Sequence, residues 1–400
     1  MAGRRRASGA RGTRVVVALC LLLVSLVGCG GRPATDSAKA EVQQVLDRRA
    51  AAILDHDETA FLRSGAGDWF GNLGAVPLAD WSYRLTTLRR TGDTALADAE
   101  LRYRVQGHDR APVSVGRTLS LRLDVEGHWY VEAERPAKGS AEQLWDQGEV
   151  SAVHGDDSLV LGVGQSDAAL RSYAELADHA VPAVSQAWGS NWPRRVVILV
   201  PMSLGDMAGL LGSPESSYRG IAAVTTGETG APASAPADRI IVNPDAYGVL
   251  GSTGKQVVLT HETTHVATRA HTTEATPLWL SEGYADWIGY LGSGRSPSQA
   301  APELWQAVTE GRAPQTLPTD EDFGFSGDAG RLARAYESGW LACRLIADRW
   351  GEVRLAEFYR AVGAHERRAG AVEGALKDVL GTSLEEFTGE WRDYLRAQLG

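Results

Sequence analysis

The pattern of apolar and polar positions predicts an α+β arrangement in the first part of the chain. Apolar side chains recur at helical spacing between residues 42 and 54, and a short segment at residues 57–62 follows them. The period then changes to apolar–polar alternation, which is typical of half-buried strands. The alternating segments are residues 101–105, 119–125 and 129–131, with a hairpin turn at residues 126–128. We therefore expect a small helix-plus-antiparallel-sheet domain over residues 37–138.

A second domain is predicted over residues 139–400, after a linker at residues 136–140. Four short apolar segments in its first half predict strands. They cover residues 159–163, 195–201, 221–225 and 239–244. A helix is expected at residues 166–188, between the first two strands, because its apolar residues recur at helical spacing.

The end of the chain, residues 332–400, has the pattern of successive helices. Gly351, Gly363 and Gly381 are expected to be C-caps, because glycine readily adopts the left-handed conformation that ends a helix. Ser383 and Glu386 are spaced as the capping box of the last helix. The predicted fold class is α+β, with a sheet in the first half of this domain and helices in the second.

Residues 1–28 have the features of a lipoprotein signal peptide. Five arginines precede an apolar run at residues 15–27 that is too short to span a bilayer comfortably. The run ends in the sequence Leu-Val-Gly-Cys, which resembles a bacterial lipobox. The resemblance implies cleavage before Cys29, a lipid on this cysteine and a tether at residues 29–36. The expected location is extracytoplasmic, lipid-anchored to the bacterial cell membrane; an ordinary secretory peptide with an incidental cysteine is the alternative.

Composition and charge narrow the range of partners. The 400-residue chain is 44% hydrophobic and has a formal net charge of −10, and loss of the signal peptide would leave about −15. Such a surface does not suit nucleic acid or an anionic bilayer, so we expect membrane attachment through the lipid. With Cys20 removed and Cys29 acylated, Cys343 is expected to be a buried thiol. The sequence gives no indication of the oligomeric state.

The pentapeptide His261-Glu262-Thr263-Thr264-His265 carries the candidate chemistry. On a helix, residues four apart lie one above the other, so His261 and His265 can bind one Zn²⁺ ion. Glu262 is then turned toward metal-bound water and is the expected general base. The pentapeptide alone is a moderately specific signal.

A second segment, Trp-Leu-Ser-Glu-Gly-Tyr-Ala-Asp at residues 279–286, supplies the third ligand. With Thr276 as N-cap and Pro277 in the first helical position, we expect a helix over residues 277–291. Zinc used for hydrolysis takes three protein ligands and leaves the fourth position to water, whose pKa it lowers toward ~7. Glu282 is the predicted third ligand.

Asp286 lies one helical turn after Glu282 and is expected to accept the outer N–H of His261, which fixes the tautomer of the imidazole. The HExxH pentapeptide followed by this Glu-to-Asp spacing resembles the gluzincin zinc metallopeptidases, especially the bacterial peptidase MA-like domains. The resemblance covers the chain from about residue 159 to its end. It implies a mixed sheet above the zinc, an edge strand at residues 220–225 that binds extended substrate, and a helical C-terminal half.

The same resemblance implies a catalytic role for Tyr336, because gluzincins use a tyrosine or histidine of the helical half to stabilise the oxyanion. Tyr336 also follows the apolar register of its helix, so an ordinary core position is equally compatible with the sequence. Exopeptidase gluzincins carry a GxMEN-type motif, which residues 220–228 lack. An endopeptidase is therefore favoured over an aminopeptidase.

The first domain is similar in topology to nuclear transport factor 2-like or cystatin-like domains. Such domains often hold a ligand pocket, and the alternative is a spacer and packing partner. For the whole chain we expect a membrane-anchored extracytoplasmic zinc metallopeptidase that acts on a peptide or protein substrate. The alternative is a lipoprotein that binds a ligand or acts as a scaffold, with an inactive peptidase domain.

Overall fold

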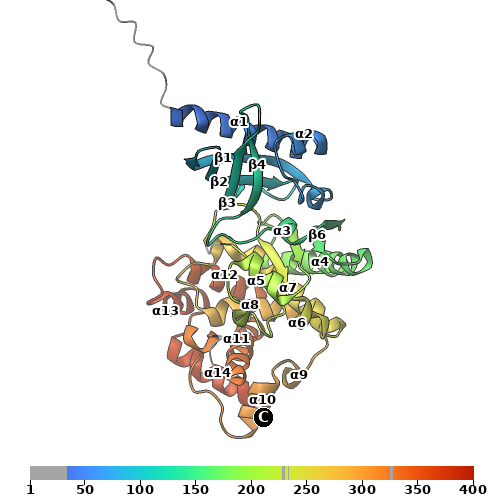
Figure 1. Cartoon of the computed structure of the whole chain (residues 1–400). Helices are drawn as coiled ribbons and strands as arrows, with labels where there is room; N and C mark the ends of the chain where they lie inside the picture. Colours follow the sequence, from blue (N-terminus) through green and yellow to red (C-terminus); the bar gives the residue numbers. More distant parts are fainter. Residues whose placement is uncertain (1–33, 228–229, 233, 325–327) are drawn as a thin grey trace, which may run out of the picture.

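The computed structural model describes residues 34–227, 230–232, 234–324 and 328–400, and its fold is α+β as predicted. Figure 1 shows a helix and a sheet at one end of the molecule and the C-terminus at the opposite end. The expected signal peptide and Cys29 lie outside the described residues. Among the described residues no helix is long and apolar enough to cross a membrane.

The N-terminal part is an antiparallel meander of four strands with helices packed against it. Its elements are α1 (Ala34–Leu54), α2 (Glu58–Arg63), η1 (Gly71–Leu73), β1 (Leu78–Thr91), β2 (Thr94–Val105), β3 (Val113–Leu123) and β4 (Trp129–Pro136). The predicted helix and the β3–β4 hairpin are confirmed. Helix α1 begins at Ala34, within the last residues of the predicted tether.

The sequence pattern did not reveal β1 and the first half of β2. In β2 the buried positions begin with Ala95, Ala97 and Ala99, and alanine gives no clear apolar signal. In β1 the alternation is interrupted by a register shift between Leu85 and Thr87. A bulge of this kind moves the following side chains to the opposite face, so the period of two is lost.

Three charged side chains, Arg49, Arg117 and Glu134, are buried among the apolar ones between α1 and the N-terminal sheet. Arg49 is fully buried, contacts the ring of Phe61 at 3.8 Å and donates to Glu134 Oε2 at 3.3 Å. Glu134 also accepts hydrogen bonds from Tyr83 at 3.0 Å and Arg117 at 3.1 Å. Each buried charge is therefore paired, and this arrangement favours the packing-partner interpretation of the domain.

The second sheet has five strands in the order β5-β6-β7-β9-β8. The elements are α3 (Leu144–Gln147), β5 (Val150–His154), β6 (Ser158–Val163), α4 (Asp167–Trp188), β7 (Val196–Val200), α5 (Leu204–Leu211), η2 (Glu215–Ser217), β8 (Ala223–Thr225), β9 (Arg239–Val242) and α6 (Pro244–Gly248). Strands β6, β7 and β9 are parallel, whereas the outer strands β5 and β8 run antiparallel to their neighbours. The predicted edge strand is confirmed as β8, although it begins at Ala223, and β5 was not predicted.

One hydrophobic core extends from the N-terminal sheet to the second sheet. Trp145 of α3 contacts Trp81 and Tyr103 of the N-terminal sheet, with ring centroids 5.3 and 5.0 Å apart. Arg117 also donates two hydrogen bonds of 2.8 Å to Asp146, beyond the predicted linker. The two sheets are therefore joined by apolar contacts and a buried ion pair.

The helical half completes the chain. It contains α7 (Ser252–Thr268), η3 (Arg269–His271), α8 (Leu278–Tyr290), α9 (Pro297–Ala300), α10 (Pro302–Thr309), η4 (Asp320–Phe323), α11 (Ala329–Trp350), α12 (Glu352–Gly363), α13 (Ala371–Ala375), the π-helical turn η5 (Leu376–Leu380) and α14 (Leu384–Leu399). The predicted caps Gly351 and Gly381 and the Ser383–Glu386 capping box are confirmed.

Two cap predictions in this half are wrong. Gly363 is the last residue of α12, and a Cβ on it would lie 1.8 Å from the carbonyl oxygen of His271, so a close backbone approach explains this glycine. Thr276 does not cap α8, because its hydroxyl accepts a hydrogen bond from the Thr273 N–H and Pro277 occupies the N-cap position.

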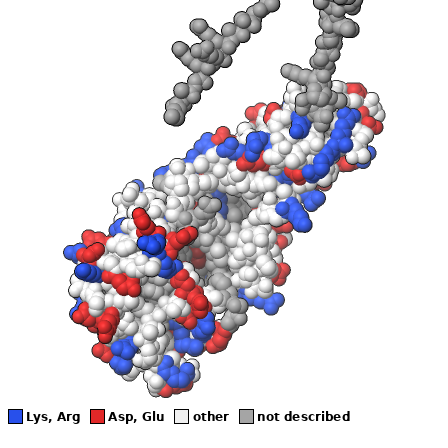
Figure 2. Space-filling model, turned by 90° about the vertical axis from the view of Figure 1, so that its left-hand side faces the viewer, with Lys and Arg blue, Asp and Glu red and all other residues white. Residues whose placement is uncertain are grey.

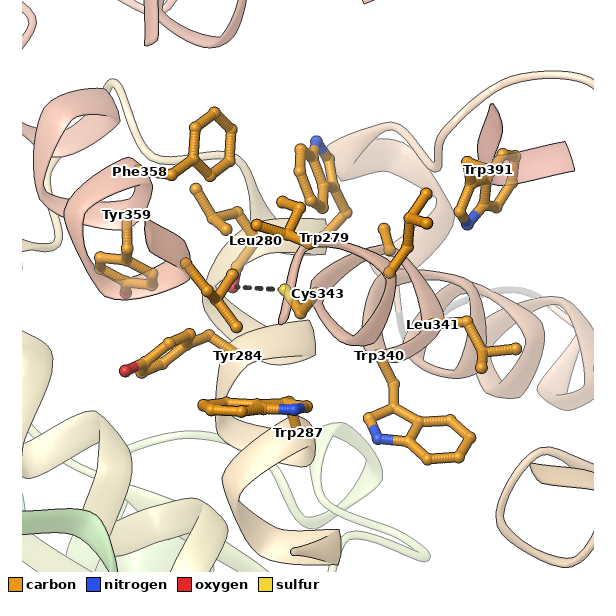
Figure 3. Close-up of a cluster of buried hydrophobic side chains, with 14 of the residues drawn as sticks. Trp279, Leu280, Tyr284, Trp287, Trp340, Leu341, Cys343, Phe358, Tyr359 and Trp391 are labelled. Carbon is orange, nitrogen blue, oxygen red and sulfur yellow. Dashed lines mark hydrogen bonds between the residues drawn. The ribbon is translucent and has the colours of Figure 1, made fainter. Parts of the chain in front are cut away.

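Helix α8 crosses both α7 and α11 at glycines. A Cβ on Gly283 would lie 2.3 Å from the backbone of Gly339 in α11, and a Cβ on Gly289 would lie 3.0 Å from the carbonyl oxygen of Val257 in α7. Figure 3 shows the aromatic side chains of α8 and α11 and the buried Cys343 thiol in the same hydrophobic cluster. Burial raises the pKa of this thiol well above its ordinary value, as expected for a structural cysteine. The close crossings hold α7, α8 and α11 in a fixed arrangement.

Candidate metal centre

Three side chains from α7 and α8 converge on one point. The Nε2 atoms of His261 and His265 lie 3.0 Å apart, and Glu282 Oε2 lies 3.2 Å from the first and 3.4 Å from the second. For a tetrahedral zinc ion with ligands at about 2.0–2.2 Å, neighbouring ligand atoms are expected about 3.3 Å apart. The spacing of these three atoms therefore fits zinc without rearrangement.

The electrostatic environment favours a cation at this point. Burial disfavours the charged form of His261, but the carboxylates of Asp286, Glu282 and Glu262 outweigh it and raise the pKa of the imidazole well above its ordinary value. Burial opposes ionisation of Glu282 too, yet the two histidines hold the pKa of its carboxyl below the ordinary value. A carboxylate-rich site of this kind also attracts a divalent metal.

Asp286 lies behind His261, as the helical spacing predicted. Its Oδ1 atom lies 2.8 Å from His261 Nδ1, so the hydrogen bond leaves Nε2 free for a metal. This contact fixes the orientation of the ring and increases its basicity as a ligand.

Replacing Asp286 with asparagine is expected to raise the dissociation constant for zinc by roughly 10–100-fold. Asparagine retains an acceptor for His261 Nδ1–H but loses the negative charge. Competition with a chelating dye measures the change, and Asp393→Asn, on an exposed side chain, is the matched control. An unchanged zinc affinity would show that the Asp286 charge does not act on the metal.

Glu262 lies beside the three converging atoms and is almost buried, with 7% of its surface exposed. The Thr225 hydroxyl on β8 donates to Glu262 Oε2 at 2.6 Å and lies 3.1 Å from the Glu262 carbonyl oxygen. The sequence did not predict this contact, because 37 residues separate the two side chains and no motif joins them.

Tyr336 of α11 lines the same cavity and packs against Phe323, with ring centroids 5.1 Å apart. Burial and the nearby carboxylates of Glu282, Asp286 and Glu262 raise the pKa of its phenol well above the ordinary value. The hydroxyl therefore stays protonated and can donate a hydrogen bond into the site. The structure places this residue in the cavity wall as well as against the core.

The converging atoms lie in a cavity of about 870 Å³ between the edge strand β8 and helix α11. Apolar side chains form much of its wall; they include Ile221, Val257, Val258, Leu278, Tyr290 and Leu332. Figure 2 shows one face of the molecule, which is hollowed below the N-terminal part and has acidic and basic side chains interspersed over the surrounding surface. The cavity is large enough to admit several residues of a peptide.

Thr263, within the pentapeptide, is fully buried, and its hydroxyl has no hydrogen-bond partner among the described residues. Thr263→Val is therefore expected to raise the free energy of unfolding by about 1 kcal/mol, because it replaces an unpaired polar group with a methyl of the same shape. Urea unfolding measures this change. A loss of stability would mean that the hydroxyl is hydrogen-bonded in solution.

The comparisons with known proteins give only distant likeness. No family model matches the sequence, and no curated protein matches it. The structure is similar to native yeast LTA4 hydrolase, with 14% identity, coverage of 70% of this chain and 44% of that chain, and a TM-score of 0.37. This chain thus spans less than half of the LTA4 hydrolase.

A second group of similar structures comes from Deinococcus radiodurans. A point mutant of its M1 zinc metallopeptidase is 12% identical, with coverage of 80% of this chain and 92% of that chain and a TM-score of 0.36. A complex of this mutant with a Tyr-Ser-Ala substrate is 11% identical and has a TM-score of 0.35, with coverage of 79% and 92%. Similarity this low carries no conclusion about activity, so the functional argument depends on the geometry of the site itself.

Proposed function

We propose that the chain is a zinc metallopeptidase that hydrolyses peptide bonds. The convergence of His261, His265 and Glu282 at spacings that suit a tetrahedral ion is the observation that carries this proposal. Glu262 lies next to these ligands, and a cavity with an edge strand along one wall adjoins them. These are the parts that hydrolysis of an extended peptide requires.

Bound zinc would supply Lewis-acid polarisation of the peptide carbonyl and would lower the pKa of the attacking water. Glu262 takes a proton from this water and delivers it to the leaving amine as the C–N bond breaks. Tyr336 donates a hydrogen bond to the oxygen on which negative charge develops. Asp286 keeps His261 in the tautomer that binds the metal.

An extended substrate is proposed to pair with β8. Among the described residues, this three-residue strand has a hydrogen-bonded neighbouring strand on one side only, so its other edge can bind a peptide backbone along the cavity. Residues 223–225 are Ala-Val-Thr, and this strand carries no acidic side chain to hold a free amino terminus. This composition favours an endopeptidase.

The test uses an internally quenched peptide with blocked ends and an unblocked aminoacyl amide. We expect the purified protein to cleave the blocked peptide faster, to lose this activity with chelator and to regain it with zinc. Cleavage of the aminoacyl amide alone would replace the endopeptidase proposal with an aminopeptidase. Zinc binding without hydrolysis of any peptide would favour the binding or scaffold protein.

Tyr336→Phe is expected to lower kcat by roughly 10²-fold and to leave KM and zinc content nearly unchanged, because the lost hydroxyl acts only in the transition state. Steady-state kinetics on the blocked peptide separate the two constants. An unchanged kcat would show that Tyr336 has only a structural role, in its contact with Phe323.

Location at the cell membrane is a separate proposal and depends on Cys29. We expect Cys29→Ala to prevent lipidation and signal processing, and Cys20→Ala is the matched control because it removes a cysteine within the same signal peptide. Fractionation and mass analysis of the mature N-terminus measure the result. An unlipidated wild-type protein would contradict the proposed anchor.

A further inference from the structure

We propose that Thr225 is a positioning residue that orients Glu262 for proton transfer from the edge strand of the substrate cleft. The inference depends on the proposed peptidase function and adds to it a residue outside the metal motifs. Strand β8 would then both bind the substrate and hold the general base, Glu262, through Thr225.

The contact between Thr225 and Glu262 is short and specific. The hydroxyl donates to Oε2 at 2.6 Å, which is at the short end for a hydrogen bond to a carboxylate. A hydroxyl has one proton, so the Glu262 carbonyl oxygen at 3.1 Å is the weaker acceptor. No other hydrogen bond to the Glu262 carboxylate occurs among the described residues. One oxygen of the base is therefore fixed, and the other remains available for water.

The strand that carries this hydroxyl is fixed at its end. Thr226 donates its N–H to the Arg239 carbonyl at 2.8 Å, and the Thr226 hydroxyl accepts the Arg239 N–H at 3.0 Å. Arg269, directly after the zinc helix α7, donates to the Thr226 carbonyl at 3.2 Å and to Asp238 at 2.5 Å. All the backbone polar groups of Thr226 are thus bonded, so the backbone next to Thr225 is held in place.

This anchor extends into the N-terminal part of the chain. Asp109 accepts two hydrogen bonds, of 2.9 and 2.8 Å, from the buried guanidinium of Arg239, and it accepts the N–H groups of Val105 and Ala237. The N-terminal part is therefore linked through Arg239 and Thr226 to the residue that contacts the general base. A backbone held from both domains can position a side chain more accurately than a free loop.

The kinetic experiment compares Thr225→Val with Thr225→Ser in zinc-loaded protein. Valine keeps the shape of the side chain and removes the hydroxyl, so kcat is expected to fall roughly 10–100-fold while KM and zinc content change less than about twofold. Serine retains the donor and is expected to restore most of the turnover. Thr118→Val is the matched control, because it removes a buried hydroxyl that donates to a carboxylate, Asp98 at 3.3 Å, in the N-terminal sheet.

A second measurement does not depend on catalysis. In metal-free protein, Thr225→Val is expected to lower the melting temperature by about 2 °C or more, because Glu262 loses its donor, and to have a smaller effect in a Glu262→Ala background. Equal effects in both backgrounds, or a serine variant as slow as the valine variant, would overturn the positioning role. If wild type cleaves no peptide but the thermal coupling is present, the proposed peptidase function fails while the Thr225–Glu262 contact stands.

Discussion

Glu262→Gln is expected to lower the turnover of a cleavable peptide by roughly 10³-fold and to leave zinc bound at about one ion per chain. Glutamine has the shape of glutamate but cannot take a proton from water. The Thr225 hydroxyl can still donate to its amide oxygen, so the side chain keeps its place in the cavity wall. The three ligand atoms are untouched by the change, and binding of metal and substrate should be retained.

Metal analysis, unfolding and single-turnover kinetics on the same preparation separate these effects. A variant with normal zinc content, a normal unfolding transition and almost no hydrolysis identifies Glu262 as the general base. Full activity of Glu262→Gln would show that Glu262 is not the general base and would contradict the proposed mechanism. Loss of zinc would instead show that Glu262 contributes to metal binding.

Glu282→Ala is expected to remove zinc from the purified protein and to abolish hydrolysis. Two histidines remain, and a hydrolytic zinc site with only two protein ligands is weak. Metal that binds only the folded state stabilises it, by about 4 kcal/mol at a thousand times the dissociation constant. The variant should therefore lose the rise in melting temperature that zinc gives the wild type, and chelator should no longer change its unfolding.

Glu274→Ala is the matched control for zinc content. Glu274 lines the same cavity, but it is exposed and is not among the three converging residues. This variant should retain zinc and the zinc-dependent melting temperature. If Glu282→Ala bound zinc with unchanged affinity, Glu282 would not be a metal ligand. The proposed three-ligand geometry would then be wrong.

The helical part of the site could be predicted because its information is local. The i, i+4 spacing of His261 and His265 sets both rings on one face of a helix, whatever packs around it. The same argument placed Glu282 and Asp286 together on α8. Strands β6, β7 and β9 were also recognisable, since buried strands are short apolar runs.

Other features of the fold could not be predicted, because they depend on contacts between residues far apart in the sequence or on local irregularities of a strand. From the sequence alone, Gly283 and Gly289 of α8 could mark either a flexible helix or a close helix crossing. The short distances to the backbone of Gly339 and Val257 show that they mark close crossings. The N-terminal sheet was found incompletely, because alanines and a bulge concealed the alternation in β1 and β2. The Thr276 cap failed for a similar reason, since Thr273 competes for its hydroxyl.

The sequence by itself determined the fold class, the helix that carries two imidazoles and the identity of the three residues that converge on the candidate metal site. Tertiary structure decided how α7 and α8 meet, that Glu282 Oε2 lies within 3.4 Å of both histidines, and that Thr225 contacts Glu262. The physical reason is the range of the forces involved. Helical periodicity follows from backbone geometry over a few residues, whereas the distance between two elements depends on side-chain volume and backbone contact across the whole core.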